Sequence, residues 1–117
     1  MPSPIWMDSD ESRKQPIIQN RLTEMLTKRN TELVVRDLNA GDFAFQSVDN
    51  HFCGIERKAA DNLLSSLTSG ELSEQVRSMH YCYDVSYVLT EGWLSIDNSG
   101  HIKTNFQTYS YIWEYWQ

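Results

Sequence analysis

The chain has 117 residues, a net charge of −6 and 40% hydrophobic residues. This length allows one domain with a single modest core, and the hydrophobic content is ordinary for a globular protein. No apolar run approaches the roughly 20 residues that a membrane helix needs, and no basic segment followed by an apolar one marks the chain for secretion. We therefore expect an intracellular protein without membrane contact. The acidic charge argues against nucleic-acid binding on bulk electrostatics, because most DNA-binding proteins carry a basic surface.

The first part of the chain has the pattern of a strand, a helix and a second strand. Residues 5–7, Ile-Trp-Met, are a short apolar run that is typical of a first, central strand. Apolar residues at helical spacing, with a proline in the first turn, predict a core-packing helix over residues 16–29. Residues 31–38 contain Leu-Val-Val and predict the second strand. The acids from Asp8 to Glu11 favour the start of a helix.

A β-hairpin is predicted next. Residues 42–48 and 52–58 contain strand formers, and the polar segment 48–51 supplies a turn. After the hairpin, residues 59–67 and 71–81 predict two helices. The rest of the chain predicts a buried strand at 85–90, a further hairpin at 93–103 and an aromatic segment at 109–116 that packs on the core or on a second subunit.

The first hairpin carries a group of charged residues with a specific chemistry. Side chains on a strand alternate between faces, so Glu56 and Lys58 point the same way and Arg57 points the other way. The hairpin is expected to bring Asp42 alongside Glu56 and Lys58. Two carboxylates can hold a hard cation such as Mg²⁺, which polarises a phosphate oxygen and lowers the pKa of a bound water. The lysine can stabilise charge on the phosphorus, so this group suits metal-assisted phosphodiester hydrolysis.

These residues resemble the signature of XPF-type structure-specific endonucleases, GDx(n)ERKxxxD. In this chain it reads Gly41-Asp42, then Glu56-Arg57-Lys58, then Asp61. Segments at residues 8–11, 35–38, 63–77 and 87–92 are also similar to that family, and the similarity spans roughly residues 5 to 92. The chain departs from the family at Asp10 and Glu71, where arginine is usual. The second departure removes a positive charge that would favour DNA phosphates.

The resemblance implies an α/β protein with the restriction-endonuclease-like fold, in which helices flank a central mixed β-sheet. It implies one XPF-type nuclease domain over residues 1–117, truncated at its C-terminus. It also implies Mg²⁺ or Mn²⁺ as the cofactor, DNA as a partner, and a homodimer or heterodimer. The implied metal ligands are Asp42, Glu56 and Asp8; the implied catalytic residues are Asp42, Glu56, Arg57, Lys58, Asp61 and Glu11; the implied DNA contacts are Arg57, Gln75 and Arg77.

Several of these residues have an ordinary structural alternative. Asp8 and Glu11 are acids where a helix begins, and Asp61 can either bond Lys58 or cap its helix. Gln75 lies on a different stripe of its helix from Leu72 and Val76, so from the residues alone it is simply an exposed helical residue.

Three functions are compatible with the sequence. The first is a metal-dependent endonuclease that cuts branched or flapped DNA in repair or recombination. The second is a catalytically weak DNA-junction or protein-binding domain of the same fold. The third is a zinc-stabilised interaction module built on two His-x-Cys pairs, His51 with Cys53 and His80 with Cys82. These pairs are too tightly spaced for usual zinc knuckles. The two cysteines suit a reducing compartment, although a single disulfide between them is also compatible with the sequence.

Overall fold

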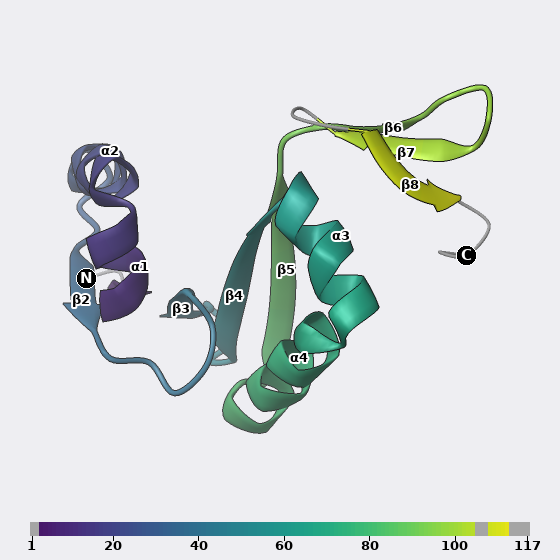
Figure 1. Cartoon of the computed structure of the whole chain (residues 1–117). Coiled ribbons are helices and arrows are strands. Elements are labelled where there is room, and N and C mark those ends of the chain that lie inside the picture. The colour runs from purple at the N-terminus through teal and green to yellow at the C-terminus, as the bar shows by residue number, and fades with distance from the viewer. Residues whose placement is uncertain (1–2, 105–107, 113–117) are drawn as a thin grey trace. The chain divides into compact units, whose positions relative to one another are not determined.

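The computed structural model describes residues 3–104 and 108–112 (Figure 1). The chain divides into two compact units, which are described separately. The first contains Met1–Glu56 and Glu74–Val88, and the second contains Arg57–Ser73 and Leu89–Gln117. The prediction of one domain over residues 1–117 stays a prediction. In the part of the chain that the structure describes, no helix is long and apolar enough to cross a membrane.

A mixed five-stranded sheet is the main element of the fold. Its strand order is β2 (Leu33–Arg36), β1 (Ile5–Asp8), β3 (Phe43–Gln46), β4 (Phe52–Ala59) and β5 (Val85–Glu91). β1 runs parallel to β2 and antiparallel to β3, and β3 runs antiparallel to β4. The predicted first strand is therefore an inner strand of the sheet.

Two helices, α1 (Ser9–Lys14) and α2 (Pro16–Thr27), lie between β1 and β2 in the chain. The predicted helix over residues 16–29 is confirmed as α2, whereas α1 is an additional helix. Ile18, Leu22 and Leu26 on α2 are half-buried. Ile17 and Met25 are 72% and 52% exposed, so the prediction that they pack in the core is wrong. The inward face of α2 is narrower than its sequence pattern predicted.

The β3–β4 hairpin is confirmed, and its turn follows from local chemistry. The backbone N–H of Ser47 donates to the carbonyl of His51 at 2.8 Å, and Asn50 has a φ of 64°. Asparagine tolerates this left-handed conformation better than most residues, which is why it is common in tight turns. The turn therefore sets the pairing of the two strands that carry the charged group.

The core of the first unit lies on the same face of the sheet as the even-numbered β4 residues. Ala44, Met79 and Tyr83 are buried together, and Trp6 and Leu38 pack against them. Met79 belongs to α4 (Glu71–Cys82), which covers this face. A Cβ atom at Gly54 would overlap the ring of Tyr83. Only glycine lets the ring approach the sheet this closely.

The second unit contains a helix and an antiparallel three-stranded sheet. The helix is α3 (Ala60–Ser69), which ends at Gly70 in a left-handed conformation, with φ 84°. The sheet has the order β6 (Leu94–Ile96), β7 (His101–Thr104) and β8 (Thr108–Ile112), so the predicted hairpin at 93–103 is confirmed. Side chains of the predicted aromatic segment, and all of residues 113–116, lie outside what the structure describes.

One predicted strand has a different environment from the one expected. β5 was expected to be buried at 85–90, but it is the last strand of the five-stranded sheet and its residues from Ser86 to Glu91 are exposed. An edge strand has a neighbour on one side only, and its side chains are less covered for that reason.

Candidate active site

The β3–β4 pairing places Asp42 beside Glu56. Phe43, the first residue of β3, pairs with Ile55, so Asp42 and Glu56 lie just beyond the last paired positions at this end of the hairpin. The backbone N–H of Asp42 donates to the carbonyl of Ile55 at 2.8 Å, which holds the start of β3 against β4. Asp42 is therefore held against the part of β4 that carries Glu56. The prediction that the two carboxylates share one face of the sheet stays a prediction.

Gly41 makes this arrangement possible. Its φ of +81° is a left-handed conformation that side chains disfavour, and a Cβ there would lie 3.2 Å from the carbonyl oxygen of Ile55. The chain turns at this glycine and enters β3 at Asp42. The Gly-Asp pair of the sequence signature thus has a conformational reason, because the residue before the acid must turn sharply beside β4.

Asp8 approaches the same position from the other side of β3. Met7 pairs with Phe43, and the N–H of Asp8 donates to the carbonyl of Asp42 at 2.8 Å. Asp8, Asp42 and Glu56 therefore occupy neighbouring positions across β1, β3 and β4, which we call the acid row. The Asp8 carboxylate also caps α1, accepting from Asp10 N at 3.2 Å, and accepts from Leu38 N at 2.9 Å. Asp8 therefore caps a helix, as its ordinary structural interpretation predicted, and also lies next to Asp42 in the acid row.

β4 shows the predicted alternation. Glu56 and Lys58 are 8% and 9% exposed, whereas Arg57 between them is less buried. Burying a carboxylate or an ammonium group is costly unless opposite charge or hydrogen bonds compensate for it. Charged residues at alternate buried positions of a strand are poor choices for a core, so they indicate a site rather than a packing role.

Two acids of the second unit contact the basic residues of β4, and the sequence did not reveal either contact. The Nε atom of Arg57 lies 2.6 Å from an oxygen of Glu91. The Nζ atom of Lys58 lies 3.9 Å from an oxygen of Glu71. Glu71 is the residue at which the family pattern usually has arginine, and here its carboxylate is near the signature lysine. The only feature of the sequence that drew attention to Glu71 was its difference from the arginine of the family pattern.

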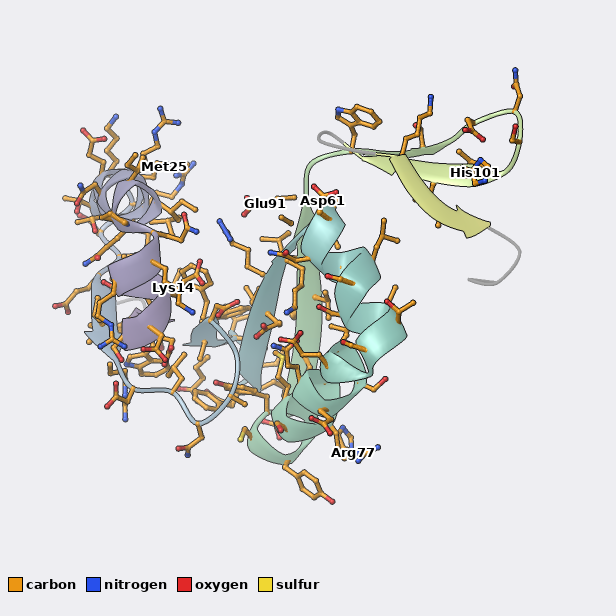
Figure 2. The ribbon with its side chains drawn as sticks, in the orientation of Figure 1. Lys14, Met25, Asp61, Arg77, Glu91 and His101 are labelled. Atoms are coloured by element: carbon orange, nitrogen blue, oxygen red, sulfur yellow. The ribbon has the colours of Figure 1, made fainter. Side chains whose placement is uncertain are left out.

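The remaining predicted residues lie on helices. Glu11 is in the first turn of α1 and is half-buried, and Asp61 is in the first turn of α3. Arg77 is exposed on α4 (Figure 2). Gln75 is half-buried, and its side-chain oxygen is buried without a hydrogen-bond partner in the described part of the chain. The role of each residue in catalysis or DNA binding stays a prediction.

The helical stripe containing Gln75 differs from the expected one. Leu72 and Met79 are buried and Val76 is 40% exposed, so Gln75 rather than Val76 lies on the inward face between them. Met79 sits one turn further along, 3.5 Å from where a Cβ on Gly41 would lie. Gln75 is therefore turned toward the sheet face that carries Asp42.

The donors present fit a hard divalent cation. Mg²⁺ is usually held by one or two carboxylates and keeps several waters, and it prefers oxygen ligands. Asp42 and Glu56 supply two carboxylates at neighbouring strand positions. Among residues 3–104 and 108–112, no three His, Cys, Asp or Glu side chains converge as a metal-binding group. The chemistry therefore fits a site completed by water and phosphate oxygens rather than one enclosed by protein ligands.

A mixed sheet flanked by helices, with acids and a lysine at the start of β3 and along β4, is the restriction-endonuclease-like fold that was predicted. The family model "ERCC4 domain" matches residues 7–113. The chain therefore belongs to the ERCC4 domain family, and the resemblance to XPF-type proteins is confirmed.

Two solved structures share this fold. XPF from Aeropyrum pernix in complex with DNA is 22% identical, with a TM-score of 0.59, over 80% of this chain and 41% of that one. A second structure, XPF from Aeropyrum pernix, is also 22% identical, with a TM-score of 0.58, over 77% of this chain and 38% of that one. The chain thus spans about two fifths of these structures. No curated protein gave a match.

Proposed function

We propose that this chain is a divalent-metal-dependent endonuclease domain that hydrolyses phosphodiester bonds in branched or flapped DNA. The observation that carries the proposal is the β3–β4 pairing, which holds Asp42 against the part of β4 that carries Glu56, in a member of the ERCC4 domain family. The likeness to an XPF structure in complex with DNA supports DNA as the substrate. Such an enzyme would act inside the cell, in DNA repair or recombination, as a homodimer or with a related subunit.

Each predicted residue has a role in this mechanism. Asp42 and Glu56 would hold Mg²⁺ or Mn²⁺, with Asp8 as a further ligand. When bound, the ion supplies a Lewis acid for the phosphate and a water of lowered pKa. The Lys58 ammonium group would donate to a phosphate oxygen as negative charge builds on it during attack. Arg57, Gln75 and Arg77 would position the DNA, and Glu11 and Asp61 would support the catalytic group.

The charge distribution explains how an acidic chain can bind DNA. Five of its ten basic residues lie within positions 12–31, where the only acid is Glu24. The five are Arg13, Lys14, Arg21, Lys28 and Arg29, and all are exposed. A basic segment in an acidic protein is an electrostatic footprint for phosphates, because local charge and not net charge decides where a polyanion binds.

The proposal is tested by incubating the chain with splayed-arm, flap and four-way DNA, with Mg²⁺ or Mn²⁺ and with chelator. Asp42→Asn and Glu56→Gln should each lower turnover more than about a hundredfold, because each removes a charged ligand. Asp49→Asn is the matched control, since Asp49 is exposed in the turn of the same hairpin. Thermal melting confirms that the variants fold. Metal-dependent cutting that survives either active-site substitution would refute the assigned ligands.

A second candidate function is a catalytically weak DNA-junction or protein-binding domain of the same fold. The observation that favours it is the Glu71 carboxylate, 3.9 Å from the Lys58 ammonium group. A carboxylate at that position competes with phosphate for the lysine. Tight junction binding without cleavage under any metal condition would select this function.

A further inference from the structure

A cavity of about 340 Å³ lies in the first unit beside Trp6 and has no role in the proposed chemistry. Four aromatic residues line it: Trp6, Phe52, Tyr81 and Tyr83. Arg36, the segment at residues 37–39 and Cys82 complete the lining. This volume is at the lower end of the range for small-ligand sites, which suits one planar group rather than a large molecule.

Three of the rings are fixed relative to one another. The ring centres of Trp6 and Phe52 are 5.6 Å apart in an edge-to-face arrangement. The ring centres of Phe52 and Tyr83 are 5.2 Å apart. The Tyr83 hydroxyl donates to the carbonyl of Ala40 at 2.6 Å, which anchors that ring. The wall of the cavity is therefore organised in advance, and a ligand would not have to order it.

The fourth ring is unusual because it has little cover. Tyr81 is 84% exposed at the end of α4, and Phe52 is also partly open to solvent. A large aromatic ring left in water at the edge of an aromatic cavity is suited to stacking on a planar partner. The cavity therefore has three rings packed on one another and a fourth ring exposed to solvent.

The polar groups of the cavity define the charge of that partner. The Arg36 guanidinium lies over Trp6, 5.7 Å from its ring centre, so a cation stands at the aromatic wall. Asn39 and Asp37 add hydrogen-bonding groups, and Asp37 already accepts from the hydroxyl of Ser9. The cavity thus offers an aromatic wall, a cation and hydrogen-bonding groups. A planar group with polar edges and an attached anion is complementary to all three. A nucleotide has this chemistry, because its base stacks and its phosphate pairs with arginine.

The cavity is close to the acid row along the strands. Trp6 precedes Asp8 by two residues on the same face of β1, about 7 Å at the usual strand rise. The N–H of Leu38, which lines the cavity, donates to Asp8 at 2.9 Å. One nucleotide of an extended strand covers a similar length.

We propose that this cavity receives an unpaired base of the DNA substrate, close to the phosphate at the acid row. The proposal rests on the proposed function and deepens it. Stacking on an aromatic wall requires a base that is not paired inside a duplex, so the cavity would distinguish splayed or flapped arms from continuous duplex. Branched-DNA preference would then come partly from this chain's own residues.

Binding is measured with chelator present, so cleavage is not needed. The DNAs are a splayed arm, the same arm with abasic sites in its unpaired part, and a duplex of equal length. Tyr81→Ala and Arg36→Ala should each weaken splayed-arm binding about tenfold, the loss expected for one base–aromatic stack, and leave duplex binding within about twofold. Tyr87→Ala is the matched control, because Tyr87 is a half-exposed tyrosine outside the cavity. Arg36→Lys keeps the charge but not the planar stacking group.

A second measurement uses the unmodified chain. Cys82 is an exposed free thiol that lines the cavity, whereas Cys53 is buried. An oligonucleotide with bases should slow alkylation of Cys82 by a maleimide, and an abasic oligonucleotide should not.

Equal protection by the abasic strand, or equal losses on duplex and splayed arms, would overturn the proposal. If flap DNA is cut with Mg²⁺ but Tyr81→Ala binds the splayed arm normally, only this inference fails. If the chain neither binds nor cuts any of the DNAs, the proposed function fails with it.

Discussion

At the residue scale, Lys58 carries the most specific chemistry outside the carboxylates. It is buried on β4, and its Nζ atom is 3.9 Å from a carboxylate oxygen of the exposed Glu71. In the proposed mechanism, this ammonium group stabilises the negative charge that builds on the phosphate.

We therefore expect Lys58→Ala to lower turnover by about 10²–10³, the range for removing one donor to a developing oxyanion. Glu71→Gln is the comparison variant, because it removes the neighbouring anion and leaves the ammonium group. It should raise DNA affinity a few-fold and leave turnover at saturating DNA within about twofold. Single-turnover cleavage and fluorescence anisotropy measure the two effects. A Lys58→Ala enzyme as fast as the parent would make the lysine structural.

Tyr83 gives a pH-dependent prediction at the same scale. Its pKa is raised above the ordinary 10.0, chiefly by burial and then by the charges of Cys82 and Asp8. A raised folded-state pKa means that the folded state holds its proton more tightly than the unfolded state. The stability from the neutral hydroxyl, which donates to Ala40, is therefore complete below about pH 10 and is lost as pH rises through the folded-state pKa.

Urea unfolding between pH 7 and 11 tests this sign. Tyr83→Phe should lower the free energy of unfolding by about 1 kcal/mol at pH 7, the usual net value of one hydrogen bond. The difference between parent and variant should shrink above pH 10, where the phenylalanine variant has no phenol to titrate. A difference that stays constant up to pH 11 would contradict the raised pKa.

At the scale of single elements, the sequence predicted those whose signals are local. The β3–β4 hairpin was predictable because strand formers flank a polar turn with Asn50, and alternation then put Glu56 and Lys58 on one face. α3 and α4 were predictable as two helices because Gly70 lies between them, and glycine is the usual residue for the left-handed conformation that ends a helix. These signals depend on residues close together in the chain.

Elements whose environment is set at long range were predicted less well. α1 has no apolar face, so the acids from Asp8 to Glu11 indicated a helix start but not a separate helix. Its cap, Asp8, also bonds Leu38, thirty residues away. β5 has an apolar sequence, but its edge position depends on strand order. On α4, periodicity put Val76 on the inward stripe with Leu72 and left Gln75 exposed, whereas the packing of Met79 against Ala44 turns Gln75 inward and leaves Val76 exposed.

The candidate site divides in the same way. In the acid row, Asp42 and Glu56 were expected side by side from the predicted hairpin. Asp8 was expected there only from the family resemblance, because the β1–β3 pairing joins segments far apart in the chain. The contacts of Lys58 with Glu71 and of Arg57 with Glu91 join residues far apart in the chain, and no periodicity encodes them. Sequence therefore located the basic residues of the site but not the acids that pair with them.

At the scale of the whole molecule, charge is distributed unevenly along the chain. The net charge is −6, yet positions 12–31 hold five basic residues and one acid. On α2, Arg21 shares a face with the exposed Ile17 and Met25, and Lys28 caps the C-terminal end of the helix. Figure 2 shows Lys14 and Met25 on this part of the chain. DNA contact through residues 12–31 would meet five basic residues and one acid.

The salt dependence of DNA binding measures how many phosphates such a segment contacts. Each neutralised phosphate contributes about −0.9 to the slope of log K against log salt, so contacts from Lys14, Arg21, Lys28 and Arg29 predict about −3 to −4. The double variant Arg21→Glu with Lys28→Glu should weaken binding at low salt and flatten the slope by about 2. Glu24→Lys, on the same helix, should strengthen binding, whereas Lys103→Glu on β7 controls for a mere change in net charge. If Lys103→Glu weakens binding as much per charge as Arg21→Glu with Lys28→Glu does, DNA affinity depends only on the total charge. The basic residues at positions 12–31 would then have no special part in binding.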